Sequence, residues 1–235
     1  MAKRTQRFSR GKKRAKEQRI KAIILLVVAF LVVVALIFVC KKLFFPKDKE
    51  PSTLTEVVDT KDKSQSMEGA PPIDVQLLTP NEYSRPQIKL EKINSVVVHY
   101  IANPGSSAQA NRDYFENLKD EHTTKASSHF IVGLEGEIIQ CVPSTEIAYT
   151  SNDRNADTLS IETCHPDETG EFNVATYDSL VELTGWLCWR FDLTSNDVIR
   201  HYDVTGKMCP KYFVEDEAAW AKFLADVDAH IKELG

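Results

Sequence analysis

The sequence has 235 residues and a formal net charge of −5, but this charge is divided unevenly along the chain. The first 21 residues hold ten Lys or Arg and one acid, a local charge of +9, so the remaining residues carry −14. Residues 1–21 therefore form a basic arm, and the rest of the chain is acidic. We expect these two parts to lie in different environments.

Residues 22–40, AIILLVVAFLVVVALIFVC, contain no charge and no proline. With a rise of about 1.5 Å per residue, a helix of this length nearly spans the ~30 Å hydrocarbon core of a bilayer. We therefore predict one transmembrane helix. A cleaved signal peptide is the alternative, but it would have a shorter apolar region and small residues at the cut, where this chain has Phe38, Val39 and Cys40.

The distribution of basic residues predicts the orientation of this span. Ten Lys or Arg precede it and two follow it directly, and basic residues resist translocation, so the amino terminus is expected in the cytoplasm. We predict a single-pass protein of the cell membrane whose later residues lie outside. The basic arm, residues 1–21, is explained by this topology and by attraction to anionic lipid, so no nucleic-acid partner is expected.

Residues 41–80 are predicted to be an extracytoplasmic linker. From residue 46 to 79 this stretch is charged, bears Ser, Thr and Pro, and has no aromatic residue. It has too little apolar surface to offset the entropy lost on ordering. Residues 81–235 remain, which is the usual length of one domain.

This domain alternates between strand and helix patterns. NSVVVHY (94–100) and TLSIETC (158–164) are typical of buried strands, and SHFIVG with EIIQCV predicts a hairpin around Leu134–Gly136. Two later segments have apolar residues at helical spacing: Leu180, Leu183, Leu187, Cys188 and Phe191, and then Trp220, Phe223, Leu224, Val227, Ile231 and Leu234. We predict an α/β domain with a central, mainly mixed sheet flanked by helices.

Three residues of this domain are candidates to bind zinc. An ion that activates water needs three nitrogen or sulfur donors from the protein and one open position. His201 and Cys209 lie eight residues apart in RHYDVTGKMCP and supply two donors if this segment folds back on itself. His99 ends an apolar strand, where α/β proteins place their sites. Each histidine alone is more typical of a structural residue, so the prediction depends on the combination.

Four motifs occur in the order seen in zinc-dependent N-acetylmuramoyl-L-alanine amidases, a family that includes phage amidase lysins and peptidoglycan recognition proteins. They are VVVHY, SSHFIVGLEGEIIQCVP, NADTLSIETC and RHYDVTGKMCP. Residues 81–235 therefore resemble this family. The resemblance implies that the metal is held by His99, His201 and Cys209, in agreement with the choice made from the residues alone.

The resemblance also implies two catalytic residues. Lys207, two residues before Cys209, matches a family lysine, and an ammonium here can stabilise the oxyanion that forms when the amide is attacked. Glu162 in LSIET matches a glutamate that one branch of the family carries in a SIGIE strand, and a carboxylate near zinc can accept the proton of water. The alternatives are a solvated loop lysine and a surface carboxylate at a strand end.

Three further residues are predicted to bind substrate: Ser128, His129 and His165. Another branch of the family has a catalytic tyrosine immediately before its HF pair, but this chain has Ser128 there, so that role is not carried over. Hydrogen bonding inside the sheet is the alternative for His129.

The predicted function is a membrane-anchored peptidoglycan hydrolase. It would use zinc-activated water to cleave the amide bond between N-acetylmuramic acid and the L-alanine of the stem peptide. Two alternatives remain at this point: a non-catalytic peptidoglycan-binding sensor, and an amidase of soluble muropeptides.

Overall fold

A computed structural model of the chain describes residues 63–235. The predicted basic arm, the predicted transmembrane helix at 22–40 and the first part of the predicted linker lie outside the described residues. Between residues 63 and 235, no helix is both long enough and apolar enough to cross a membrane.

In this described part, six strands form one mixed sheet with the order β1-β4-β3-β5-β2-β6. Only the β3–β4 pair is antiparallel, which confirms the predicted hairpin. The other neighbouring pairs are parallel. The strands are β1 (Asp74–Val75), β2 (Ser95–Val98), β3 (Phe130–Val132), β4 (Ile138–Gln140), β5 (Thr158–Thr163) and β6 (Val198–Arg200).

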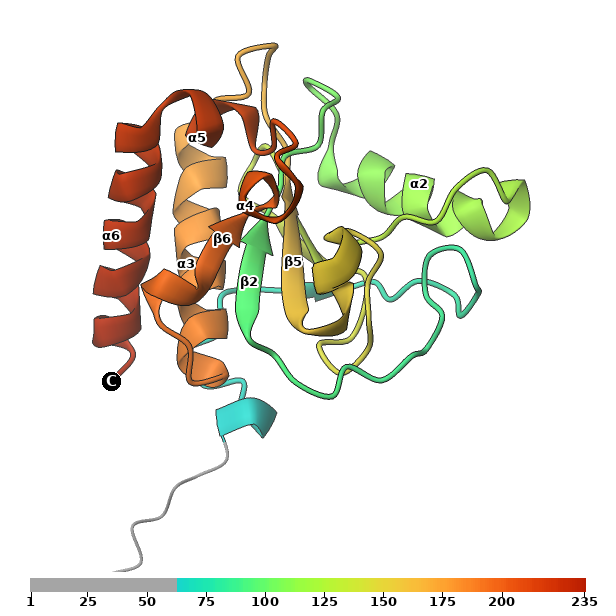
Figure 1. Cartoon of the computed structure of the whole chain (residues 1–235), viewed down its shortest axis with the longest axis horizontal. Helices are drawn as coiled ribbons and strands as arrows, with labels where there is room; N and C mark the ends of the chain where they lie inside the picture. The colour runs from blue at the N-terminus through green and yellow to red at the C-terminus, as the bar shows by residue number, and fades with distance from the viewer. Residues whose placement is uncertain (1–62) are drawn as a thin grey trace, which may run out of the picture. The chain divides into compact units, whose positions relative to one another are not determined.

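Helices cover both faces of the sheet, as expected for the predicted fold class. Helices α3 and α6 pack together on one face, and α2 lies on the other (Figure 1). The helices are α2 (Ala108–Glu121), α3 (Val174–Arg190), α4 (His201–Thr205), α5 (Lys211–Glu215) and α6 (Glu217–Glu233), with short 3-10 turns η1 (Lys63–Gln65), η2 (Asn152–Ala156) and η3 (Ser195–Asp197). The apolar spacing predicted α3 and α6 but not α2.

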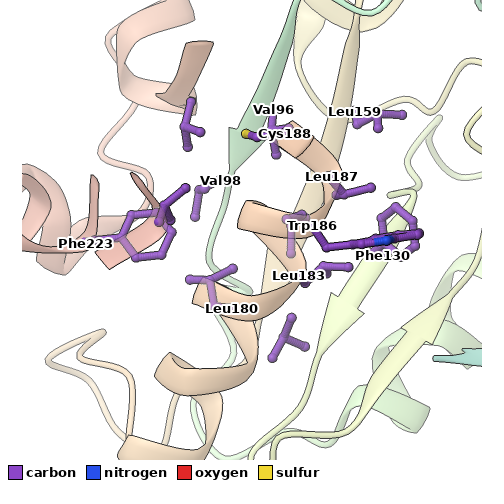
Figure 2. Close-up of a cluster of buried hydrophobic side chains, with 14 of the residues drawn as sticks. Val96, Val98, Phe130, Leu159, Leu180, Leu183, Trp186, Leu187, Cys188 and Phe223 are labelled. Carbon is purple, nitrogen blue, oxygen red and sulfur yellow. The ribbon is translucent and has the colours of Figure 1, made fainter. Parts of the chain in front are cut away.

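The core between the sheet and α3 shows which strand side chains point toward α3 and which point to the opposite face. Val96 and Val98 of β2 are fully buried and pack with Leu159 of β5 against Leu183 and Leu187 of α3 (Figure 2). Side chains alternate between the two faces of a strand. The residues that alternate with these therefore point to the face opposite α3.

The compact domain begins earlier than predicted. The sequence predicts that residues 63–80 belong to the linker, yet Trp186 Nε1 donates to the carbonyl of Glu68 at 3.1 Å and Arg190 Nη2 donates to that of Ser64 at 2.7 Å. Strand β1 joins the sheet beside β4, and Leu78 is fully buried. The composition was misleading here because a few well-placed contacts order a segment that is polar on average.

Candidate metal centre

The strand register brings three of the predicted residues to one edge of the sheet. Val98 pairs with Ile161 of β5 and with Arg200 of β6, all in parallel strands. The next residues along the three strands are His99, Glu162 and His201. Because side chains alternate along a strand, these three side chains point away from the face that packs on α3. They meet at the carboxyl end of β2, where Figure 1 shows α4.

The segment after β6 folds back and delivers the third donor. Helix α4 begins at His201 and ends after one turn at Gly206, whose φ of 76° lies in the left-handed region that favours glycine. The chain then reverses, and the backbone N–H of Tyr202 donates to the carbonyl of Cys209 at 2.9 Å. This bond places the thiol of Cys209 beside the histidine at the start of the same segment, as the zinc prediction required.

His99, His201 and Cys209 form a compact, buried group of donors. Their ligand atoms lie within 4.8 Å of one another, and Cys209 Sγ is 3.8 Å from His99 Nδ1. His201 Nδ1 is buried and has no hydrogen-bond partner among residues 63–235. An unpaired buried nitrogen is costly unless it has a ligand. Two imidazoles and a thiol are also donors that zinc prefers, so this group fits the predicted ion.

The protonation states of the donors follow from their burial. Burial lowers the pKa of His99 well below its ordinary value, and it also lowers the pKa of His201. Both imidazoles are therefore neutral near pH 7, as a metal ligand must be. Burial raises the pKa of the Cys209 thiol to about 12, so this donor must lose a proton when it binds a cation.

Glu162 lies beside this group, on the neighbouring strand. Its side chain is partly buried, and Oε2 is enclosed without a hydrogen-bond partner among the described residues. Burial raises the pKa of Glu162 from its ordinary value of 4.5 to about 8, while the positive charge of Lys207 acts in the opposite direction. Lys207 itself is exposed, on the loop between α4 and Cys209.

A sequence profile of the N-acetylmuramoyl-L-alanine amidase family matches residues 89–212, which include all five of these residues. The chain belongs to the N-acetylmuramoyl-L-alanine amidase family.

Similar proteins agree with this amidase assignment. The N-acetylmuramoyl-L-alanine amidase CwlL of Bacillus licheniformis is 35% identical over 162 residues, or 63% of this chain and 44% of CwlL. BlyA of Bacillus subtilis strain 168, of the same activity by name, is 34% identical over 63% of this chain and 45% of its own length. This chain thus spans less than half the length of these curated relatives.

Solved structures show the same amidase fold. PlyL superposes with a TM-score of 0.59 at 22% identity, over 68% of this chain and 98% of PlyL. The catalytic domain of XlyA superposes with a TM-score of 0.57 at 25% identity, over 66% of this chain and 99% of that domain.

The three predicted substrate-binding residues of this amidase domain are all buried. Ser128 donates to the Phe130 carbonyl at 3.0 Å, and His129 lies between the Ser160 hydroxyl and the Glu146 carbonyl. These two contacts agree with the alternative for His129, which is hydrogen bonding inside the sheet.

His165 is likewise enclosed, with Nδ1 2.7 Å from the carbonyl of Asp167 and Nε2 3.3 Å from that of Ile101. The structure therefore brings Ser128, His129 and His165 to internal polar contacts rather than to an open surface. Their contact with substrate stays a prediction.

Sequence reasoning missed two residues of the amidase centre. Ser151 Oγ lies 3.1 Å from His99 Nε2, and Asn152 Oδ1 lies 2.9 Å from His201 Nε2. Both residues sit at the start of η2, in a loop with no periodic pattern. No signal in the sequence could have identified them without knowing which strands are neighbours.

Proposed function

We propose that this protein is a zinc-dependent N-acetylmuramoyl-L-alanine amidase of peptidoglycan. It would hydrolyse the amide that joins the lactyl group of N-acetylmuramic acid to the first L-alanine of the stem peptide. The convergence of two neutral histidines and a thiol beside an enclosed carboxylate carries this proposal. The family membership of the domain supports it.

Residues of the chain have distinct parts in this reaction. When bound, the zinc ion supplies a Lewis acid that polarises the carbonyl and acidifies water. Glu162, in its ionised form, accepts the proton of the attacking water and returns a proton to the departing amine. The ammonium of Lys207 stabilises the negative charge that develops on the carbonyl oxygen. The carbon–nitrogen bond breaks, leaving a carboxylate on the lactyl group and a free amine on L-alanine.

Product analysis tests the proposed function. The full-length protein, purified in detergent and loaded with zinc, is incubated with intact sacculi and separately with soluble muropeptides, and new chemical ends are identified by mass spectrometry. Cleavage of sacculi with new lactyl carboxylates and new L-alanine amines is the expected result. Cleavage of soluble muropeptides but not of sacculi would show that the substrate is the fragments and not the polymer. Binding to sacculi without any new ends would identify a sensor.

We also propose that residues 22–40 anchor the domain in the cell membrane, with the amino terminus in the cytoplasm. The uncharged length of this segment and the basic arm before it support the proposal. Protease added to intact cells should remove a tag after residue 235 and leave a tag at residue 1 protected. The reverse pattern would exclude this orientation.

A further inference from the structure

The two histidines of the metal centre are held from behind by consecutive residues of one loop. Ser151 contacts Nε2 of His99, and Asn152 contacts Nε2 of His201. In both rings this leaves Nδ1 for the centre: that of His99 faces Cys209, and that of His201 has no hydrogen-bond partner among the described residues. The contacts and the free nitrogens are therefore arranged in the same way on both rings.

The contact with Asn152 selects one tautomer of His201, and the contact with Ser151 is compatible with the same tautomer of His99. A neutral imidazole carries a proton on one nitrogen and a lone pair on the other. The amide oxygen of Asn152 only accepts hydrogen bonds, so His201 donates from Nε2 and presents the lone pair of Nδ1. The hydroxyl of Ser151 can donate or accept, and it accepts from His99 when this ring carries its proton on Nε2. In metal sites such contacts orient the ligands and raise their basicity.

We propose that Ser151 and Asn152 are positioning residues of the metal centre, which hold both histidines as the Nε2–H tautomer and direct both Nδ1 atoms at the ion. The inference rests on the proposed zinc site and assigns it a second layer of residues. It places both supports on one short loop, so that a shift of this loop would disturb two ligands together.

The loop is built to present two neighbouring side chains to one site. Consecutive side chains of an extended segment point in opposite directions, so the backbone must bend here. Asn152 has a φ of 52°, in the left-handed region where Asn is more common than most residues. Asn155 Oδ1 holds the bend by accepting the backbone N–H groups of Thr150 at 3.0 Å and Ser151 at 2.6 Å.

The variants are chosen to separate the hydrogen bond from the backbone. Asn152→Gly removes the amide but keeps a residue that adopts positive φ freely. Asn152→Asp keeps an oxygen that accepts a hydrogen bond. Gln87→Gly is the matched control, since it makes a similar change at an exposed position of another loop with a φ of 56°.

Zinc affinity and the histidine tautomer are both measured. The full-length protein in detergent is stripped of metal and titrated with zinc against a chromophoric chelator, and ¹⁵N NMR of the metal-free protein reports which ring nitrogen carries the proton. Asn152→Gly should weaken zinc binding by about 10- to 100-fold and give His201 a mixture of tautomers. Asn152→Asp and Gln87→Gly should bind as the wild type does. Ser151→Ala should act on His99 in the same way.

Two results would overturn the inference: unchanged zinc affinity in Asn152→Gly, or a proton on Nδ1 of His201 in the wild type. Ser151 is buried, and if Ser151→Ala does not fold, the exposed Asn152 still decides the outcome. A wild type that does not bind zinc would instead refute the proposed function. The tautomer measured in the metal-free protein would then still decide whether this loop positions the rings.

Discussion

At the scale of single residues, the three proposed ligands differ in whether they must lose a proton before they bind a cation. His99 and His201 are already neutral near pH 7 because burial lowers the pKa of each. Cys209 is protonated near pH 7, because burial raises the pKa of its thiol to about 12. The proton of Cys209 is therefore the main competitor of the ion.

This difference predicts how zinc binding depends on pH. Binding of the ion releases the thiol proton, so affinity should rise about tenfold for each pH unit between about pH 6 and 8, measured by chelator competition. Cys209→Ser should lose most of the affinity. Cys188→Ser is the matched control, because burial also raises the pKa of this thiol to about 12, but Cys188 lies on α3 within the core. An affinity that stays constant with pH would show that the thiolate is not a ligand.

Glu162 and Lys207 allow chemistry to be separated from metal binding. Glu162→Gln keeps the shape of the side chain and removes its basicity, so turnover of sacculi should fall by about 100-fold or more while zinc binding is retained. Lys207→Met should act similarly, and the double variant should be less than additive because both groups act on one transition state. Glu182→Gln, on the exposed face of α3, serves as the control. Normal turnover in Glu162→Gln would show that Glu162 has no catalytic role and is only a carboxylate at the end of a strand.

The sequence allowed the ligands to be predicted but not their supports. Zinc restricts the choice to a few residue types, and RHYDVTGKMCP places two of them in one short segment. Ser151 and Asn152 belong to common residue types, and each lies about 50 residues from the histidine it contacts. Their roles arise because η2 packs against α4, a proximity that the sequence pattern does not show.

At the scale of elements, the reversal after α4 joins two ligands. Helix α4 ends at Gly206, whose positive φ lets the chain return so that Cys209 reaches His201. A Cβ atom added at Gly206 would meet no atom within 4 Å, so a substitution here changes the backbone preference and no contact.

Gly206→Ala should therefore cost about 1 kcal/mol or more of stability through backbone strain alone. Part of this strain should be relieved by opening the turn, which would lower zinc affinity by up to about tenfold, equivalent to 1.4 kcal/mol. Gly105→Ala is the matched control, with a φ of 75° and its nearest neighbouring atom at 3.8 Å from the added carbon. Chemical denaturation and zinc titration should show similar losses of stability in the two variants and a loss of affinity only in Gly206→Ala.

Elements with strong hydrophobic periodicity were predictable, and the others were not. Strands β2 and β5, the β3–β4 hairpin and helices α3 and α6 all bury apolar runs. Helix α2 buries only Ala108, Asn111, Phe115 and Leu118, a face too sparse to give a clear helical pattern. Strands β1 and β6 have two and three residues and, unlike β3 and β4, pair only with strands distant in the sequence, so neither an alternation nor a hairpin turn marks them.

At the scale of the whole molecule, the boundary of the domain has consequences for stability. A variant that begins at residue 81 lacks β1, the buried side chain of Leu78 and the carbonyl that accepts from Trp186. Compared with a variant that begins at residue 63, its free energy of unfolding should be lower by about 2–5 kcal/mol, the usual cost of removing a buried leucine. Leu78→Ala in the longer variant should reproduce much of this loss. Equal denaturation midpoints would show that residues 63–80 rest on the domain without stabilising it.

The contacts of residues 63–68 also determine from which end the chain enters the domain. Ser64 and Glu68 bond to Arg190 and Trp186 in the last turns of α3. Strands β5 and β6 are both parallel to β2, so α3, which connects β5 to β6, runs from the carboxyl ends of the strands back to their amino ends. Figure 1 shows η1, in cyan, at the bottom of the domain and α4 near the head of the β2 arrow in the upper half. The described part of the chain therefore begins near the amino ends of the strands, whereas its three metal donors gather at their carboxyl ends.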